Sequence, residues 1–355
     1  MDGYKFLMQN YDVGDKVCLF GFSRGAYTAR ALAGMLHKVG LLSKDNIEQI
    51  PFAYQLYTST KPEDITLAEG FKATFSRQVP IDFLGVWDTV ASVGVIMGKS
   101  LPFVDVNTTI RVFRHALSLD EHRTKFRPNL YHRSNARQAV TKGRGIRHLF
   151  QRNKAKVVTE PTVGNIQGGE DELYEADAKE VWFVGCHADV GGGVAPDTAP
   201  HALANIPLRW MIQEIVLAEC SILFDFDAFA RWNLPITLGQ HYPPLSVDAA
   251  DKSGNGTETS PPDSDQQDAQ DVVQPITDQL TKIPAWWLLE IIPTSFTYQN
   301  SENKWVTRWS FHLGRGRWVP KNPLFHKSVK TRMDDSTLKY KPRAQYTKGT
   351  ETYVS

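Results

Sequence analysis

The chain has 355 residues, of which 41% are hydrophobic and 22% charged, and its formal net charge is +1. This length accommodates one large α/β domain or two smaller domains, and the composition is typical of a globular protein. The near-neutral charge gives no electrostatic support for nucleic-acid binding. No apolar run reaches the ~18 residues that a transmembrane helix requires.

The three cysteines, Cys18, Cys186 and Cys220, are widely spaced. An odd number without zinc-ligand spacing predicts neither a disulfide framework nor a metal site. The N-terminus lacks the basic segment and apolar core of a secretory signal peptide. We therefore predict a cytoplasmic protein that needs no metal or other cofactor.

The first clear strand is expected at residues 16–20, after a short amphipathic helix over residues 2–11. It leads into Gly21-Phe-Ser-Arg-Gly25, and residues 27–38 have the apolar stripe of a helix. A Gly-x-Ser-x-Gly between a strand and a helix is typical of a nucleophile elbow, the tight turn that exposes a catalytic serine. Ser23 is therefore the candidate nucleophile.

The residues around Ser23 suit this chemistry. Gly21 and Gly25 are small, so we expect both to let the strand and helix backbones pass close together. The backbone N–H of Arg24 then lies at a helix N-terminus, where it can donate to an oxyanion.

A second buried strand is predicted at residues 80–87, after two surface helices over residues 46–59 and 63–76. Asp88 follows this strand directly. Functional groups in open α/β sheets collect beyond the carboxyl ends of strands, so Asp88 is the candidate acid of a triad. The alternative is that its carboxylate only caps the next turn.

Residues 110–122 are predicted to form a helix, and its two histidines, His115 and His122, are left out of the candidate site. The following stretch, residues 123–156, is strongly basic. It is either a patch for an anionic headgroup or a solvated loop, and charge runs are usually solvated.

The third strand is predicted at residues 180–185, and His187 follows it. A histidine held at a strand end beside a glycine-rich loop is a candidate general base. Asp189 is a rival acid or an accessory residue, and together with His187 it makes only a weak two-ligand metal site. Residues 191–193 are all glycine but fit no nucleotide-binding motif.

The domain organisation is predicted from changes in composition. Residues 1–245, with a helix at 205–219, form the α/β core, and residues 246–274 read as a disordered acidic insertion. Residues 275–335 form a C-terminal helix and a hairpin at 305–319 that pack on the core, and residues 336–355 are a flexible tail. The apolar stretch 283–293 is either a core helix or a lid or membrane anchor.

Four stretches together resemble the type VI secretion phospholipase effector-like α/β-hydrolase family. They are Gly21-Phe-Ser-Arg-Gly-Ala-Tyr-Thr-Ala-Arg30, Phe83-Leu-Gly-Val-Trp-Asp-Thr-Val90, Arg114-His-Ala-Leu-Ser-Leu-Asp-Glu121 and Val181-Trp-Phe-Val-Gly-Cys-His-Ala-Asp-Val-Gly-Gly-Gly193. The stretch that contains Trp286 and Trp287, together with the acidic insertion, looks like the family's fungal branch. The resemblance implies a mostly parallel sheet flanked by helices, with Ser23 as nucleophile, Asp88 as acid and His187 as base.

One family feature is missing from this sequence. Members begin with a strand that leads into an Asp-Gly-Thr motif, and this chain starts downstream of it, so we expect the first strands to be lacking. The resemblance implies cleavage of carboxylic esters, with a lipid or small-molecule ester as substrate and peripheral membrane contact in the lipid case. The alternative is a catalytically inactive scaffold or binding module.

Overall fold

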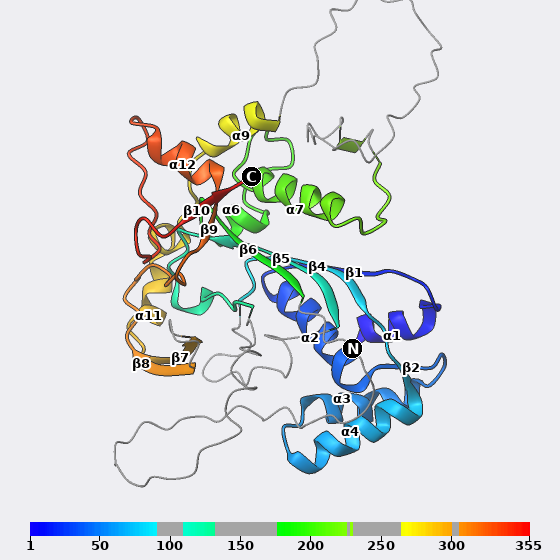
Figure 1. Cartoon of the computed structure of the whole chain (residues 1–355). Coiled ribbons are helices and arrows are strands. Elements are labelled where there is room, and N and C mark those ends of the chain that lie inside the picture. The colour runs from blue at the N-terminus through cyan, green and yellow to red at the C-terminus, as the bar shows by residue number, and fades with distance from the viewer. Residues whose placement is uncertain (91–108, 132–175, 226–227, 230–263, 300–304) are drawn as a thin grey trace, which may run out of the picture.

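The computed structural model describes residues 1–90, 109–131, 176–225, 228–229, 264–299 and 305–355 (Figure 1). Six parallel strands form the central sheet in the order β1-β4-β5-β6-β9-β10. Their bounds are β1 (Val17–Phe22), β4 (Ile81–Trp87), β5 (Ile110–Ser118), β6 (Asp177–Phe183), β9 (Leu324–His326) and β10 (Thr352–Val354). Among the described residues, β1 forms one edge of this sheet.

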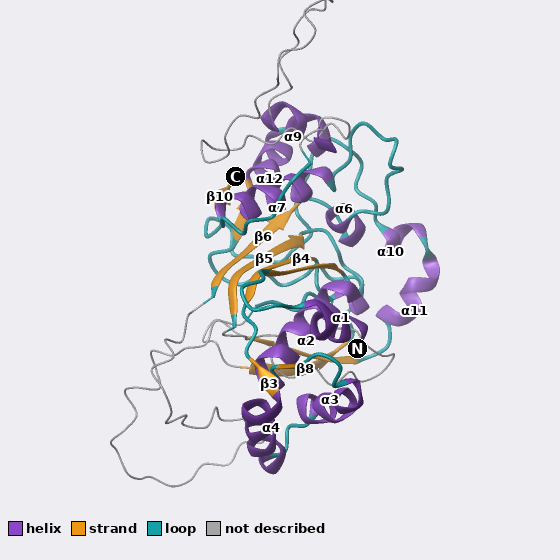
Figure 2. Ribbon diagram, turned by 90° about the vertical axis from the view of Figure 1, so that its right-hand side faces the viewer, coloured by secondary structure: helices purple, strands orange, loops and turns teal. Residues whose placement is uncertain are grey.

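Helices cover both faces of the sheet (Figures 1 and 2). One face carries α1 (Asp2–Asn10), α2 (Arg24–Val39), α3 (Ile50–Thr58) and α4 (Pro62–Phe75), and the other carries α6 (His187–Gly191), α7 (Asn205–Leu217), α9 (Ser264–Val272) and α12 (Lys327–Asp334). The sheet is therefore the middle layer of a three-layer α/β fold, as the sequence predicted.

The remaining elements are short. They are β2 (Leu41–Leu42), η1 (Ile47–Gln49), β3 (Ser76–Arg77), η2 (Thr124–Phe126), α10 (Gln279–Lys282), η3 (Pro284–Trp286), α11 (Trp287–Glu290), β7 (Thr294–Gln299) and β8 (Trp305–Ser310). Two of the strand pairs, β2 with β3 and β7 with β8, are antiparallel.

The core consists of two hydrophobic clusters, one on each face of the sheet. Successive side chains of the buried strands alternate between them: Val112 packs in one cluster and Phe113 in the other. Strands covered on both faces read as nearly continuous apolar runs. This explains why the strands at residues 16–20, 80–87 and 180–185 were visible in the sequence.

The predicted helix at residues 110–122 is wrong, because residues 110–118 form the central strand β5. A strand buried on both faces has no polar side, so its apolar residues also match a helical spacing. Two polar side chains obscured the pattern further, and each has a partner. Arg114 Nε lies 2.5 Å from Glu214 Oε2, and His115 Nδ1 lies 2.9 Å from Glu180 Oε1.

The C-terminal part of the chain is more closely integrated than predicted. β9 and β10 extend the sheet, so strands from beyond the expected core boundary at residue 245 complete it. Residues 264–272 of the expected disordered insertion form α9, whose Asp271 pairs with Arg209 of α7, whereas residues 246–263 lie outside the described residues.

The predicted flexible tail at residues 336–355 is also wrong. Its last strand is β10, Tyr340 donates from its hydroxyl to Asp120, and the Gln345 N–H donates to the Arg317 carbonyl. Buried polar partners of this kind fix a segment that looks polar and basic in sequence. The predicted hairpin at residues 305–319 is instead β7 paired with β8, because the turn around Gly314 packs against Trp287 rather than joining two strands.

Buried His326 at the end of β9 makes the fold sensitive to acid. Burial, helped by nearby Lys327 and Arg209, lowers the pKa of His326 from 6.5 to about 3. The unfolded chain therefore takes up a proton near pH 6.5 that the native protein accepts only near pH 3, and stability falls as the pH drops through this window. The slope contributed by this one group is up to about 1.4 kcal/mol per pH unit. Urea unfolding of His326→Gln should show a weaker pH dependence than the wild type over this window, and parallel curves would contradict the assignment.

Candidate active site

Ser23 lies at the turn between β1 and α2, and its backbone is strained. Its φ of 58° and ψ of −121° place a non-glycine residue in a sparsely populated region. The Ser23 N–H donates to the Trp87 carbonyl over 3.0 Å, which ties this turn to the end of the neighbouring strand β4. The residue is partly exposed. This combination of strain and exposure is typical of a nucleophile elbow.

Only one of the two predicted glycines makes the close approach possible. A Cβ on Gly21 would lie 2.5 Å from the Gly25 carbonyl oxygen, whereas a Cβ on Gly25 would meet nothing within 4 Å. The strand-side glycine is therefore required by packing, and the helix-side glycine is not.

The structure brings Ser23, His187 and Asp88 together at the carboxyl edge of the sheet. His187 Nε2 lies 2.7 Å from Ser23 Oγ, and His187 Nδ1 lies 2.5 Å from Asp88 Oδ2. An ionised carboxylate only accepts hydrogen bonds, so the proton of the neutral ring is on Nδ1 and the Nε2 lone pair faces the serine hydroxyl. This is the arrangement in which an imidazole can take the hydroxyl proton.

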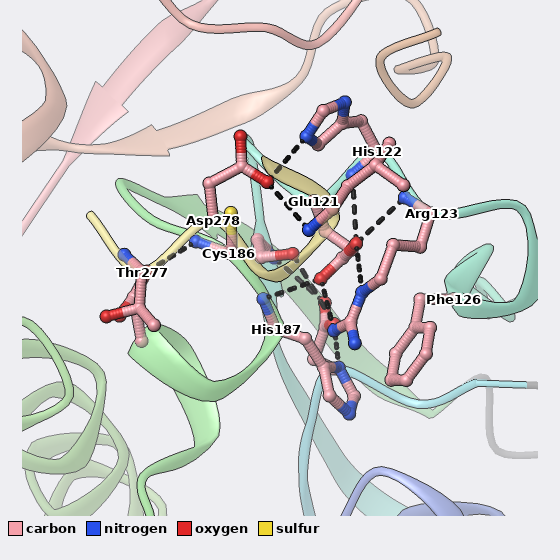
Figure 3. A network of polar contacts seen from close by, with 12 residues as sticks. Glu121, His122, Arg123, Phe126, Cys186, His187, Thr277 and Asp278 are labelled. Carbon is pink, nitrogen blue, oxygen red and sulfur yellow. Dashed lines mark hydrogen bonds and ion pairs between the residues drawn. The ribbon is translucent and has the colours of Figure 1, made fainter. Parts of the chain in front are cut away.

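Two aromatic rings hold the His187 imidazole in place. The Phe22 ring centroid lies 4.6 Å from that of His187, and the Phe126 ring meets it edge-on at 4.8 Å (Figure 3). Packing on two sides restricts the rotation of the imidazole.

Asp88 is fully buried, and both oxygens of its carboxylate accept hydrogen bonds. The Arg317 guanidinium binds both carboxylate oxygens, with Nη1 2.5 Å from Oδ1 and Nη2 2.8 Å from Oδ2. The Ser118 N–H donates to Oδ1 over 2.9 Å. Burial on its own would raise the pKa of Asp88, but the charge of Arg317 and the hydrogen bonds from Arg317 and His187 hold this pKa far below its ordinary value.

Asp189, the rival acid, does not contact the imidazole of His187 through any hydrogen bond seen in the described residues. Its Oδ2 accepts from the N–H groups of Cys186 and Thr277, so it caps α6 and anchors the segment before α10. Burial raises the pKa of this carboxyl. Within the described residues no cluster of three metal-ligating side chains occurs, so the weak metal alternative gains no third ligand.

A second carboxylate, Glu121, supports His187 from the other side (Figure 3). Its Oε2 accepts from the His187 N–H over 3.2 Å, and both its oxygens accept from the Arg123 guanidinium. The Arg123 guanidinium also stacks 3.5 Å above the Phe126 ring. Arg123, the first residue of the predicted basic stretch, is thus a paired structural residue, and residues 132–156 of that stretch lie outside the described residues.

Sequence reasoning missed Arg317, Glu121 and Phe126. Arg317 lies 229 residues from its partner Asp88, and no local pattern links the two positions. Glu121 and Phe126 fall after β5, which was misread as a helix. A correct assignment of that strand would have placed both residues at the carboxyl edge of the sheet, where functional groups gather.

Arg24 is the first residue of α2. The first four N–H groups of a helix have no acceptor within that helix, so the Arg24 N–H has no acceptor within α2, and it follows Ser23 directly in the chain. A partial positive charge accumulates at this end of a helix.

Residues 283–292, which include η3 and α11, expose most of their apolar side chains. Five of them are largely exposed: Ile283, Trp287, Leu288, Ile291 and Ile292. Exposed Leu313 lies alongside, because its N–H donates to the Glu290 carbonyl. We call these six residues the apolar rim. Its neighbour Trp286 contacts Phe126, which contacts His187, so the rim adjoins the candidate site.

Comparison with known proteins identifies the family of the chain and a yeast relative. The family described as "T6SS, Phospholipase effector Tle1-like, catalytic domain" matches residues 1–214. The "Uncharacterized protein YEL023C" of Saccharomyces cerevisiae is 28% identical over an alignment of length 463, which covers 92% of this chain and 66% of that protein.

Two solved structures are also similar. An uncharacterised protein from Pseudomonas aeruginosa has a TM-score of 0.31 at 19% identity and covers 61% of this chain and 26% of its own. The Tle1 effector, in the structure titled as bound to the VgrG spike of the type 6 secretion system, has a TM-score of 0.24 at 21% identity and covers 52% of this chain and 25% of its own. The present chain thus spans about two thirds of the yeast relative and about a quarter of each solved chain.

The two glycines of the turn offer a matched pair of variants. Gly21→Ala forces the strand away from the helix and moves Ser23, so we expect a loss of stability of about 1–3 kcal/mol and loss of reaction at Ser23. Gly25→Ala adds the same methyl group in open space and should keep both. Thermal unfolding and reaction with a fluorophosphonate probe measure the two effects. Equal behaviour of the two variants would contradict the assigned role of Gly21.

Proposed function

This chain belongs to the Tle1-like family of phospholipase effector catalytic domains of type VI secretion systems, and we propose that it is a serine hydrolase that cleaves carboxylic esters. In this proposal Ser23 is the nucleophile, His187 the general base and Asp88 the acid. The observation that carries the proposal is the continuous hydrogen-bonded row from Ser23 Oγ through the imidazole to the Asp88 carboxylate.

The proposed reaction has two steps and needs no cofactor. His187 Nε2 takes the Ser23 hydroxyl proton while Oγ attacks the ester carbonyl, and the Arg24 N–H donates to the developing oxyanion. The ester C–O bond then breaks, and the imidazolium returns the proton to the leaving alcohol. Water, activated by the same imidazole, hydrolyses the acyl-enzyme. Asp88 keeps the imidazole in the correct tautomer and stabilises its charged form.

The proposed substrate is a lipid ester. The phospholipase description of the family supports this class. The apolar rim, which Trp286 and Phe126 connect to His187, provides a surface for acyl chains. Lys282 and Arg315 are the exposed charged residues within the segments 281–293 and 311–317, and both are cations. An apolar surface with cations around it matches an anionic lipid surface. In the described residues none of the helices has the length and apolar content to cross a bilayer, and peripheral contact is the form of membrane association that we propose.

The second candidate function is a binding module without turnover. Nothing in the hydrogen bonds at Ser23 favours it, since a silent site has no need for an oriented imidazole. We also propose a cytoplasmic location, which is supported by the three unpaired cysteines, because disulfides are rare in reducing compartments.

Replacement of the nucleophile separates the two candidate functions. Ser23→Ala should abolish labelling by a fluorophosphonate probe and lower the hydrolysis of p-nitrophenyl esters by roughly a thousandfold or more. The matched control is Thr28→Ala, which removes an exposed hydroxyl of the same helix α2 that donates only to the Arg24 carbonyl. Absence of labelling in the folded wild type would favour the binding module instead.

The apolar rim can be tested independently of turnover. Leu288→Ser with Ile291→Ser removes two side chains that are 65% and 55% exposed, so co-sedimentation with phosphatidylglycerol vesicles should fall several-fold. The control is Leu217→Ser with Leu223→Ser, which changes two apolar residues outside the rim that are even more exposed, at 75% and 94%. If both double variants bind vesicles like the wild type, the proposed membrane contact is wrong.

A further inference from the structure

We propose that Arg317 is a positioning residue of the catalytic triad, which holds Asp88 ionised and oriented and thereby extends the activity of the site toward acidic pH. This inference rests on the proposed function. It adds a fourth residue from a part of the chain that the family match, residues 1–214, does not include.

The contact between Arg317 and Asp88 is a closed, bidentate ion pair. The guanidinium side chain is 2% exposed and the carboxylate side chain is fully buried. Nη1 also donates to the Ser118 carbonyl and hydroxyl, over 3.1 and 2.7 Å, and Nε donates to the Phe126 carbonyl over 3.1 Å. Paired donors on both oxygens fix the plane of the carboxylate, and that plane determines where Oδ2 meets the imidazole.

The segment that carries Arg317 is itself held rigidly. A Cβ on Gly316 would lie 1.8 Å from the Arg343 carbonyl oxygen, so the two backbones touch. The Arg317 carbonyl accepts from the Gln345 N–H over 2.7 Å, and the preceding Gly314 N–H donates to Glu290. The backbone that carries Arg317 is therefore fixed, and this limits the positions that its guanidinium can take beside Asp88.

The charges around the pair set the direction of the pH effect. Within the described part of the chain, the other ionisable groups near Asp88 and His187 are Glu121 and Arg123, which pair with each other, His115 of β5, and Asp189 and Cys186 at the start of α6. With Arg317 present, the charge of its guanidinium balances the charge of the Asp88 carboxylate. Without Arg317, the negative charge of Asp88 has no counter-charge beside it. The pair of Asp88 and His187 then binds a proton at higher pH. A proton bound by this coupled pair leaves an imidazolium, which cannot accept the hydroxyl proton of Ser23.

The test compares pH profiles of kcat/KM for ester hydrolysis in the wild type, Arg317→Met and Arg317→Lys. Arg317→Met should move the midpoint of the acidic limb upward by about one pH unit or more. Arg317→Lys keeps the charge but loses the two-pronged hydrogen bonding of the guanidinium to both oxygens of Asp88. This variant should lower kcat about tenfold or more and keep a midpoint close to that of the wild type. The control is Arg111→Met, which removes another arginine–aspartate pair, that with Asp82 at the opposite end of β4, and should leave the midpoint unchanged.

Each result bears on one proposal. A wild-type midpoint in folded Arg317→Met overturns the role of Arg317, however low the activity is. If Arg317→Met does not fold, Arg317→Lys decides: wild-type kcat and midpoint in that variant overturn the positioning role. An inactive wild type that Ser23→Ala does not change overturns the proposed function itself, and the two failures are therefore distinct.

Discussion

The buried carboxylate of Asp88 imposes the main constraint on this structure. A charge without access to water is tolerated only when it is paired and hydrogen-bonded, and Asp88 is fully buried. Its donors come from three separate regions: His187 after β6, Ser118 at the end of β5 and Arg317 in the C-terminal part. Asp88 also has a positive φ of 42°. The surrounding elements must therefore hold both its backbone and its side chain.

This constraint explains why the C-terminal part of the chain cannot be regarded as an accessory. Strand β9 pairs with β6, whose end leads to His187, and Gln345 anchors the Arg317 backbone. Asp120 ties the same two regions together, since it accepts from the Gly185 N–H and the Tyr340 hydroxyl. The site belongs to a sheet that is assembled from both ends of this sequence.

Local signals in the sequence predicted much of the fold and three residues of the candidate site. Ser23, Asp88 and His187 each follow an apolar strand directly, so their common edge of the sheet was predictable from chain order. These local signals failed where the partner of a residue lies far away in the sequence. Strand β5 looked helical because its burial on both faces hides the alternation, and the partner of Arg114 is Glu214, 100 residues away. Arg317 stands in a short run of glycine and arginine with no pattern that points to Asp88.

The distance in sequence between Asp88 and Arg317 also determines when the site can assemble during synthesis of the chain. A ribosome makes Arg317 229 residues after Asp88 and makes β9 later still. Until then the nascent Asp88 carboxylate stays in water or binds a proton, and the open side of β6 has no partner strand. Non-local pairing of this kind folds slowly and leaves strand edges accessible to other chains. The growing polypeptide therefore keeps this strand edge and the Asp88 carboxylate without their native partners until the last quarter of the sequence has been made and has docked.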